Sequence, residues 1–377
     1  MAEKTFKQLV LQGKGGPWII NEKPIPKAGV GQIVVKMTAC SICNQTDLNT
    51  VRALHPPHDH QIEGMVPHHF RQWDNRLDGD PLQDAYPSQR YELEPYPTTM
   101  GHEGMGVIVK MGPQHQTHYG TATKNMMHMG PTFQVGDRVS LVAALGGFGE
   151  YVISTPTECV KVPDGMSNDV ASLYEPVGVV HNVVKQLVSV GDDVLILGQG
   201  SLGLIATQLC KIYGADRIIT SEPVAARRDL SKKYGADAVI DPTAQNVVHA
   251  VEDLTNGQGC KIVIEAAGVP DTIRILPYVV RFGGSIGQIG ACCEPVLVDW
   301  SYIHFKGVKI TCPMQETFRS NRVYPNPELT MKLLGRLDFD DIITHRIPLT
   351  AEAAEDIFAK IEKGDEVIKA IFEIAEE

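Results

Sequence analysis

The chain has 377 residues, which is enough for two domains with separate hydrophobic cores. Its composition, 43% hydrophobic and 21% charged, is that of a globular protein. The net charge of -11 argues against nucleic acid and anionic membrane surfaces as partners, because both repel an acidic protein. No apolar stretch reaches the ~18 residues that span a bilayer, and the N-terminus lacks an apolar signal core, so a cytoplasmic protein is expected.

The first half of the chain is rich in short strand-like runs separated by Gly and Pro. Strands are predicted at 31–39, 106–110, 137–142 and 150–153. Two stretches, 51–97 and 113–134, show little periodicity and are interpreted as insertions. Loops of this length usually serve as lids or interfaces.

From about residue 175, strand-like runs alternate with helical stretches, which predicts a parallel sheet covered by helices. The strands are expected at 194–197, 217–220, 238–240, 261–264 and 284–289. The helices are expected at about 201–213, 224–234, 245–254 and 270–281. The tail from about residue 310 mixes both kinds of segment and is expected to return to the first domain.

A glycine-rich turn, Gly198-Gln199-Gly200-Ser201-Leu202-Gly203, follows one predicted strand and opens a helical stretch. This G-x-G-x-x-G pattern is typical of dinucleotide binding. The first glycine permits the tight turn, the second lets backbone approach the pyrophosphate, and the third allows close packing of helix on strand. The helix N-terminus adds partial positive charge, so Ser201 and Leu202 join the three glycines as cofactor-binding candidates.

An acidic residue at the end of the next strand favours NAD over NADP. Glu222 lies about 20 residues beyond Gly203, where a carboxylate accepts hydrogen bonds from the adenosine ribose and repels a 2′-phosphate. Arg227, on the following helix, weakens this preference because it could meet a phosphate if Glu222 swings aside. Gly268 and Ile289 lie in turns after later strands, at the sheet edge where ligands bind; plain strand–loop structure explains these turns equally well.

Three residues of the kinds that bind zinc are Cys43, His102 and Glu175. Thiolate, imidazole and carboxylate supply the mixed set of three protein ligands that a catalytic zinc needs, with the fourth position left for water or substrate. Each residue alone has an ordinary structural explanation, as a core thiol, a hydrogen-bonded turn histidine and a helix-start acid. The eight cysteines are scattered and not spaced as a disulfide framework, so reduced thiols are expected.

Taken with the glycine-rich turn, these residues resemble the zinc-dependent alcohol and polyol dehydrogenases of the medium-chain dehydrogenase/reductase superfamily, over nearly the whole chain. The motifs that carry the resemblance are Cys43 with Thr46-Asp47, Gly101-His102-Glu103, Gly136-Asp137-Arg138-Val139, Gly146-Gly147-Phe148-Gly149-Glu150-Tyr151-Val152 and Glu175-Pro176. Glu175-Pro176 and Ser221-Glu222-Pro223 are closest in pattern to the sorbitol and butanediol dehydrogenase branch.

The resemblance implies an α/β fold in which a GroES-like β-barrel catalytic domain, 1–174 and 313–377, clasps a doubly wound Rossmann domain, 175–312. The active site is then expected in the cleft between the two domains. One catalytic zinc per subunit is expected on Cys43, His102 and Glu175. Glu103 is implied as a neighbour of these ligands or as an exchangeable ligand.

Three further roles follow from the resemblance. Thr46 matches the hydroxyl that contacts the substrate oxygen and passes on its proton. Asp47 matches the carboxylate that orients the zinc histidine. Lys369 matches a basic residue near the cofactor pyrophosphate, and a solvated lysine is an equally good interpretation.

The chain also departs from the family pattern. Both Asn44 and Gln45 stand between Cys43 and Thr46, where most members have one residue, which puts the placement of Thr46 in question. The four-cysteine lobe is missing, so no structural zinc is expected. The segment 51–97 carries a histidine cluster, for which a solvated or interfacial role is favoured over a second metal site.

The predicted reaction is hydride transfer between an alcohol, with a secondary alcohol or polyol favoured, and NAD. NADP is the less favoured cofactor, and a homodimer or homotetramer acting on a small molecule is expected. Two alternatives remain open on the same scaffold: a non-redox lyase or isomerase that uses zinc or bound NAD, and a non-catalytic nucleotide-binding protein. A zinc-free enone or quinone reductase is a lesser alternative. The substrate itself is not predicted.

Overall fold

The computed structural model describes residues 4–53, 96–113, 133–142, 146–292, 296–312, 327–364 and 366–374. Most of the two expected insertions, 51–97 and 113–134, therefore lies outside the described residues. The histidine cluster falls there as well, namely His55, His58, His60, His68 and His69.

The first part of the molecule is a β-rich domain built from two sheets. One sheet has the order β2-β1-β4, with β1 Thr5–Leu11, β2 Trp18–Pro24 and β4 Thr98–Thr99. The other has the order β15-β16-β3-β5-β6-β8, with β7 paired to β3. Its strands are β3 Ile33–Ser41, β5 Glu103–Met111, β6 Arg138–Leu141, β7 Tyr151–Ser154, β8 Cys159–Lys161, β15 Ile343–Pro348 and β16 Lys369–Glu373.

The second part is a parallel sheet with the order β11-β10-β9-β12-β13-β14. Its strands are β9 Asp193–Leu197, β10 Arg217–Ser221, β11 Ala238–Ile240, β12 Cys260–Glu265, β13 Val280–Gln288 and β14 Lys309–Thr311. Its helices are α8 Ser201–Ile212, α9 Ala225–Lys233, α10 Val247–Leu254, α11 Pro270–Val279 and α12 Trp300–Lys306. The predicted α/β fold class is confirmed.

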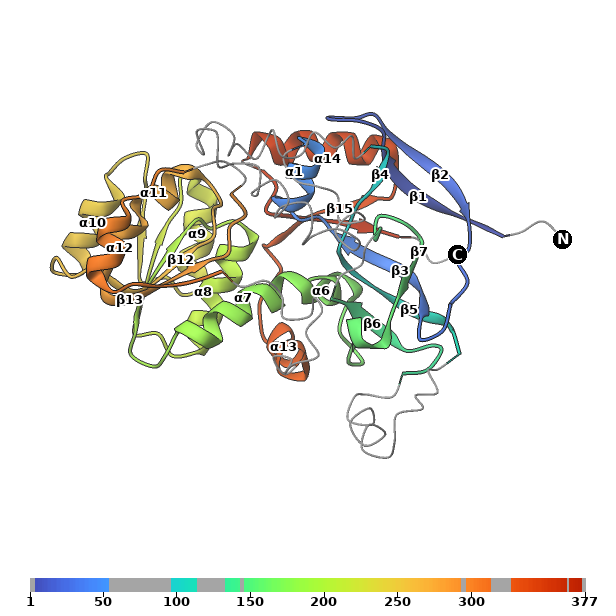
Figure 1. Cartoon of the computed structure of the whole chain (residues 1–377), viewed down its shortest axis with the longest axis horizontal. Helices are drawn as coiled ribbons and strands as arrows, with labels where there is room; N and C mark the ends of the chain where they lie inside the picture. Colours follow the sequence, from blue (N-terminus) through green and yellow to red (C-terminus); the bar gives the residue numbers. More distant parts are fainter. Residues whose placement is uncertain are drawn as a thin grey trace, which may run out of the picture.

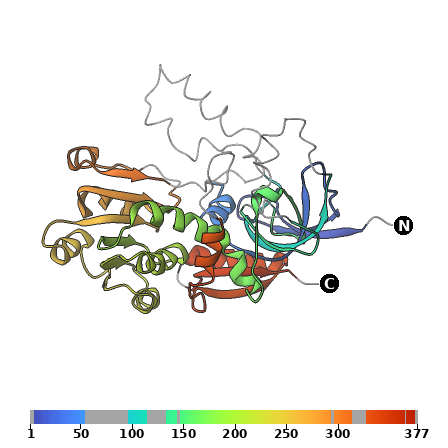
Figure 2. The ribbon, with the colours of Figure 1, turned by 90° about the horizontal axis from the view of Figure 1, so that it is seen from below.

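The two parts lie side by side in both views of the ribbon (Figures 1 and 2). Helix α7 runs from beneath the parallel sheet toward the β-rich part, where α6 continues the line (Figure 1). The elements around these sheets are α1 Thr46–Val51, η2 Pro156–Glu158, α6 Asn168–Ser172, α7 Tyr174–Leu187, α13 Pro327–Leu334 and α14 Ala351–Lys363. Within the described residues, no helix combines the length and the apolar character needed to cross a membrane.

One apolar cluster joins the two parts. It contains Ala39 of β3 and Met105 of β5 together with Val180 of α7, Val194 of β9 and Ile205 of α8. A second cluster fills the β-rich part, and a third lies between the parallel sheet and the helices of its other face. Shared burial of this kind holds the domains in contact because separating them would expose apolar surface to water.

The position of β9 marks where a ligand would bind. β10 lies on one side of β9 and β12 on the other, so the chain changes direction across the sheet at this strand. In open parallel sheets the crevice for ligands lies beyond the carboxyl ends of the strands at such a point. The glycine-rich turn follows β9 directly and therefore faces this crevice.

The expected strands and helices of the second half are all present, with ends that differ by a few residues. β13 begins earlier than expected, because the expected strand 284–289 is the end of a longer strand, Val280–Gln288. The tail returns to the first part as predicted, since β16 pairs antiparallel with β3. The expected domain boundaries at 174/175 and 312/313 stay a prediction.

Candidate metal and cofactor site

Two adjacent strands bring the candidate metal ligands together. Cys43 follows β3, and Glu103 opens β5 directly after His102; in the antiparallel pairing Ser41 stands opposite Glu103. Donor atoms of Cys43, His102 and Glu103 all lie within 4.8 Å of one another. The pairing of β3 with β5 therefore brings Cys43 and His102 close together in space although they are far apart in the sequence.

Gly101 allows the approach to His102. Its φ is +92°, and a Cβ placed there would lie 2.5 Å from Cδ1 of Phe148. Phe148 is fully buried and packs edge-on against Phe372 at 4.8 Å between ring centroids. The Gly-His-Glu motif and the Gly-Gly-Phe-Gly motif are thus in contact, and a side chain at Gly101 would push the metal-ligand strand away from its support.

Asp47 connects the histidine and the cysteine. Its Oδ1 lies 3.4 Å from Nδ1 of His102, and its Oδ2 accepts a 2.9 Å hydrogen bond from the backbone N–H of Cys43. Burial lowers the pKa of His102, but the Asp47 carboxylate and the Cys43 sulfur outweigh it and the net shift is upward. With Nδ1 directed at a carboxylate, Nε2 is the ring nitrogen left for a metal.

Glu103 forms a buried ion pair with Lys369. Nζ of Lys369 lies 2.5 Å from Oε2 of Glu103, and the lysine also donates a 2.8 Å hydrogen bond to the carbonyl of Ile42. The hydroxyl of Ser41 donates to the same carboxylate oxygen. Burial raises the pKa of Glu103, but the charges of Lys369 and His102 outweigh it, and the net pKa is lowered. Glu103 is therefore held as a carboxylate.

Glu175 stands in the first turn of α7, close enough to feel the same charges. Removal from water raises its pKa to about 8, and the carboxylates of Glu103 and Asp47 add to this rise while His102 and Lys369 oppose it. The compact donor group among the described residues contains Glu103 and not Glu175. The sequence analysis named Glu175 as the carboxylate ligand, whereas in the structure Glu103 is the carboxylate grouped with Cys43 and His102.

Thr46 begins α1 beside the candidate metal ligand. Its backbone N–H points at Sγ of Cys43, with 3.4 Å between the atoms. Asn44 and Gln45 both bond to other segments, and the placement of the Thr46 hydroxyl at a substrate stays a prediction. The Asn44 amide donates to the carbonyl of Ile368 at 3.0 Å, and the Gln45 amide crosses to the parallel-sheet domain.

This donor set fits a zinc ion. Thiolate, imidazole and carboxylate are all zinc ligands, and ligands on one tetrahedral zinc lie about 3.5 Å apart, which small side-chain movements would achieve here. The His102 ring already has a carboxylate behind it, the usual support of a metal-bound histidine.

The glycine-rich turn has the geometry expected of a phosphate-binding loop. Gly198 has φ +91°, and a Cβ on Gly203 would lie 2.0 Å from the carbonyl oxygen of Gly198. A Cβ on Gly200 would meet no atom within 4 Å, so the backbone is open on this side. Helix α8 starts at Ser201 with Leu202 in its first turn, and its N-terminal N–H groups suit an anion. These residues fit the diphosphate of a dinucleotide.

Glu222 is tied to this turn. It follows β10, is buried, and accepts hydrogen bonds from the backbone N–H of Gln199 at 2.6 Å and of Val224 at 3.0 Å. Arg227 points elsewhere: its Nη2 donates to the carbonyls of Gly364 at 2.9 Å and Val367 at 3.2 Å. The arginine thereby ties α9 to the segment before β16.

Glu265 organises the turns that contain Gly268 and Ile289. Its Oε1 accepts from the backbone N–H groups of Ala267 and Gly268, and its carbonyl accepts from Ile289 N–H at 2.8 Å. Burial raises the pKa of Glu265 although these hydrogen bonds oppose the shift. Both turns therefore lie together beyond β12 and β13, as the sequence predicted for the carboxyl edge.

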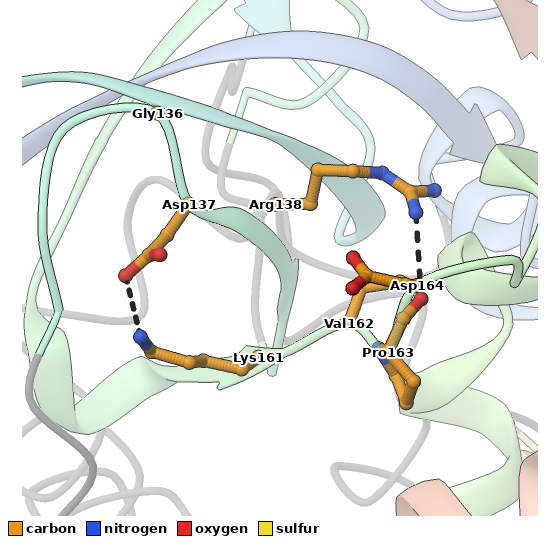
Figure 3. Close-up of a pocket in the computed structure, with 7 residues that line it drawn as sticks. All are labelled: Gly136, Asp137, Arg138, Lys161, Val162, Pro163 and Asp164. Carbon is orange, nitrogen blue, oxygen red and sulfur yellow. Dashed lines mark hydrogen bonds and ion pairs between the residues drawn. The ribbon is translucent and has the colours of Figure 1, made fainter.

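Three of the charged side chains that line a surface hollow beside the Gly-Asp-Arg-Val motif have partners (Figure 3). Asp137 pairs with Lys161 at 2.8 Å. The Arg138 guanidinium donates to the carbonyl of Met166 at 2.7 Å and to the side chain of Asn168 at 2.8 Å. The motif therefore ties β6 to the start of α6 and supports the chain that leads to Glu175.

Sequence reasoning missed two partners at the site. Ser41 and the Lys369–Glu103 pair were not predicted, although Lys369 was singled out for a contact with the pyrophosphate. The lysine's described partners are Glu103 and Ile42, and the pyrophosphate contact stays a prediction. The unusual placement of a lysine in the apolar run Val367–Phe372 was the available signal that it is buried.

Comparison with known proteins agrees with this geometry. Residues 80–164 match the model of the alcohol dehydrogenase GroES-like domain, and residues 201–327 match that of the zinc-binding dehydrogenases. L-threonine 3-dehydrogenase of Pectobacterium carotovorum subsp. carotovorum is 26% identical over 352 residues, covering 89% of this chain and 90% of that protein.

Solved structures share the fold over the whole chain. 2R,3R-butanediol dehydrogenase from Bacillus subtilis is 21% identical with a TM-score of 0.72, covering 99% of this chain and 100% of that one. A Sinorhizobium meliloti 1021 protein bound to NADP, described as a zinc-binding dehydrogenase, is 22% identical with a TM-score of 0.73, covering 99% and 100%.

A GroES-like domain joined to a parallel sheet with a glycine-rich turn, together with a compact group of candidate metal ligands, is the arrangement of a zinc-binding dehydrogenase. The chain belongs to the zinc-dependent medium-chain dehydrogenases/reductases. It is therefore an enzyme, a dehydrogenase that acts on a small molecule.

Proposed function

We propose that this enzyme oxidises a secondary alcohol or polyol, with NAD as the hydride acceptor. The observation that carries the proposal is the compact group of Cys43, His102 and Glu103 donor atoms, within 4.8 Å of one another, beside a dinucleotide turn. Two relatives support the substrate class, because the names L-threonine 3-dehydrogenase and 2R,3R-butanediol dehydrogenase both denote compounds with a hydroxyl on a secondary carbon.

Cys43 and His102 would hold zinc, with Glu103 or Glu175 as the carboxylate ligand. Zinc bound there supplies a Lewis acid that lowers the pKa of an alcohol hydroxyl toward neutrality. Asp47 keeps the His102 ring oriented through the 3.4 Å contact at Nδ1. Lys369 keeps Glu103 ionised, so that the carboxylate remains available beside the metal.

Thr46 would move the proton. Thr46 stands at the start of α1, and its backbone N–H points at the Cys43 sulfur. Its hydroxyl would therefore lie near a substrate oxygen bound at the metal. A hydroxyl can accept the alcohol proton and donate its own in one relay. A nicotinamide bound at the glycine-rich turn would supply the hydride acceptor, and the protein's part is to fix distance and orientation.

Glu222 supports NAD over NADP. Its buried carboxylate lies at the end of β10 and beside the turn after β9, where it would face the adenosine ribose and oppose a 2′-phosphate. Arg227 is held by two backbone carbonyls and would have to leave them to reach a phosphate. Gly268, Ile289 and Lys369 complete the proposed cofactor contacts.

The assembly is proposed as a cytoplasmic homodimer or homotetramer, with residues 1–174 and 313–377 forming the catalytic domain and 175–312 the cofactor domain. Light scattering on the purified protein measures the number of subunits. Limited proteolysis followed by mass spectrometry tests the proposed domain boundaries.

The test of the function combines metal content with turnover. Cys43→Ala should lose zinc and alcohol oxidation while NADH still binds, because the thiolate is separate from the nucleotide turn. Cys40→Ala is the matched control, since Cys40 is a buried thiol outside the donor group and should keep its zinc. A panel of secondary alcohols and polyols, assayed with NAD and with NADP, identifies the substrate class. Alcohol oxidation by Cys43→Ala at the wild-type rate would contradict the proposal.

A further inference from the structure

The side chain of Gln45 spans the two domains. Its Nε2 donates to the carbonyl of Ala267 at 2.5 Å, and its Oε1 accepts from the backbone N–H of Ala291 at 2.7 Å. Gln45 itself precedes α1 and lies two positions from Cys43, in the β-rich domain. One amide therefore uses both its donor and its acceptor on the cofactor domain.

Both partners of Gln45 lie where a dinucleotide would bind. Ala267 follows β12 and Ala291 follows β13, so both stand beyond the carboxyl ends of neighbouring parallel strands, of which β12 pairs with β9. Ala267 also borders the glycine-rich turn, since a Cβ on Gly198 would lie 2.9 Å from the Ala267 Cβ. The amide thus lies in the crevice between the nucleotide turn and the candidate metal ligands.

The space around this amide is tight. A Cβ on Gly268, whose φ is +68°, would lie 2.2 Å from Nε2 of Gln45. Gln45, Ala267 and Ala291 are all half-buried, so solvent partly reaches this place. A ligand group entering at this point would meet the Gln45 amide before it met the backbone.

We propose that the Gln45 amide occupies the hydrogen-bonding positions of the nicotinamide nucleoside and that cofactor binding displaces it. This inference rests on the proposed use of a nicotinamide cofactor. A nicotinamide carries the same primary carboxamide as Gln45, and its ribose hydroxyls also donate and accept, so either can satisfy Ala267 O and Ala291 N. The Gln45 side chain is an uncharged amide, and it is long enough to rotate away.

The consequence is a lowered affinity for the cofactor. Two hydrogen bonds must break before the nicotinamide nucleoside enters, and their loss opposes cofactor binding. The adenosine half, which is expected at the Glu222 end of the crevice, does not meet Gln45. Gln45 therefore sets the affinity for one half of the cofactor only.

The test is calorimetric titration of the zinc-loaded protein with NADH and, separately, with AMP. Gln45→Ala is expected to bind NADH about tenfold more tightly than wild type, with AMP affinity unchanged. Gln45→Met keeps the length of the side chain without the amide and is expected to tighten NADH binding less. Gln186→Ala is the matched control, because within the described ranges the Gln186 amide bonds to Asn182 of its own helix and not to the cofactor crevice.

Equal or weaker NADH binding by Gln45→Ala overturns the proposal and makes Gln45 a plain contact between domains. A parallel gain in AMP affinity overturns it as well, since the effect would then not be confined to the nicotinamide half. If Gln45→Ala does not fold, judged by its melting temperature and zinc content, the Gln45→Met titration decides by the same criterion. A wild-type protein that binds neither NADH nor NADPH contradicts the proposed function and not this inference alone.

Discussion

Nζ of Lys369 lies 2.5 Å from Oε2 of Glu103, and both side chains are almost completely buried, on β16 and β5, the two strands that flank β3 in one sheet. Burial lowers the pKa of Lys369, but the negative charges of Glu103 and Cys43 outweigh it and the net shift is upward. Both groups of the pair are thus charged, and the Lys369 ammonium offsets the negative charge of the Glu103 carboxylate beside the candidate metal ligands.

Removing one member of this pair should be costly. Lys369→Met leaves Glu103 as a buried charge without its cation, and the expected loss is about 3 kcal/mol of unfolding free energy. Urea unfolding of the protein measures it. Lys360→Met is the control, because Lys360 forms an exposed pair with Asp356 and should unfold close to the wild-type midpoint. If both variants unfold alike, the buried pair does not stabilise the fold as argued.

Asp47 should act on zinc affinity through His102. Asp47→Asn removes the negative charge at Nδ1 of the ring, while the shape and the possibility of accepting the Cys43 N–H remain. We expect zinc affinity to fall about 10- to 100-fold, measured by competition with a chelator. Asp271→Asn changes an acid that is exposed and paired with Arg274, and its zinc affinity should match wild type. If Asp47→Asn binds zinc as tightly as wild type, the role of Asp47 is to hold the backbone at Cys43 through its hydrogen bond.

Local patterns in the sequence predicted most of the fold. The turn at Gly198–Gly203, its strand and its helix depend on glycine spacing and apolar periodicity within a short window, and they are present as expected. The opening strands β1 and β2 were not predicted, because their mixed polar residues give a weak alternation and the pairing with β4 supplies the rest.

The candidate site was predicted only in part, for a physical reason. Cys43, His102 and Asp47 carry recognisable chemistry, and the structure brings them together. The Lys369–Glu103 pair depends on β16 returning beside β3 from the far end of the chain, which no local pattern encodes. The contact of Gln45 with the cofactor domain depends in the same way on how two domains pack.

The hydroxyl of Thr46 should be required for proton transfer. Thr46→Val keeps the shape of the side chain and removes the hydroxyl, and we expect kcat to fall at least 100-fold, with zinc content retained. Thr46→Ser keeps the hydroxyl and should recover most of the rate. Steady-state assays of both variants across pH give the comparison, since losing the relay also changes the pH profile. Similar rates for the two variants would assign Thr46 a packing role beside Cys43.

Glu222 should control the choice between NAD and NADP. Glu222→Gln can still accept the Gln199 N–H, but it no longer repels a 2′-phosphate. The ratio of kcat/KM for NAD over NADP is expected to fall about tenfold, which corresponds to about 1.4 kcal/mol. Glu252→Gln, an exposed change on α10, should leave the ratio alone. If the ratio of kcat/KM for NAD over NADP is unchanged in Glu222→Gln, residues other than Glu222 discriminate between the two cofactors.

His181 should make stability depend on pH. It is buried between Thr330, 2.8 Å from Nδ1, and Tyr213, 2.7 Å from Nε2. Burial lowers its pKa from 6.5 to about 4, so the unfolded chain binds more protons than the folded chain between these values. Stability is therefore full above pH 6.5 and declines as the pH falls toward 4, by up to about 3 kcal/mol.

Urea unfolding at a series of pH values measures this decline. His181→Gln should flatten the profile between pH 4 and 6.5, because the substituted side chain takes up no proton in the unfolded state. His249→Gln is the control, since His249 is exposed on α10 and its replacement should leave the slope unchanged. A His181→Gln protein that loses stability with the same slope as wild type shows that other groups, among them the carboxylates, carry the acid sensitivity.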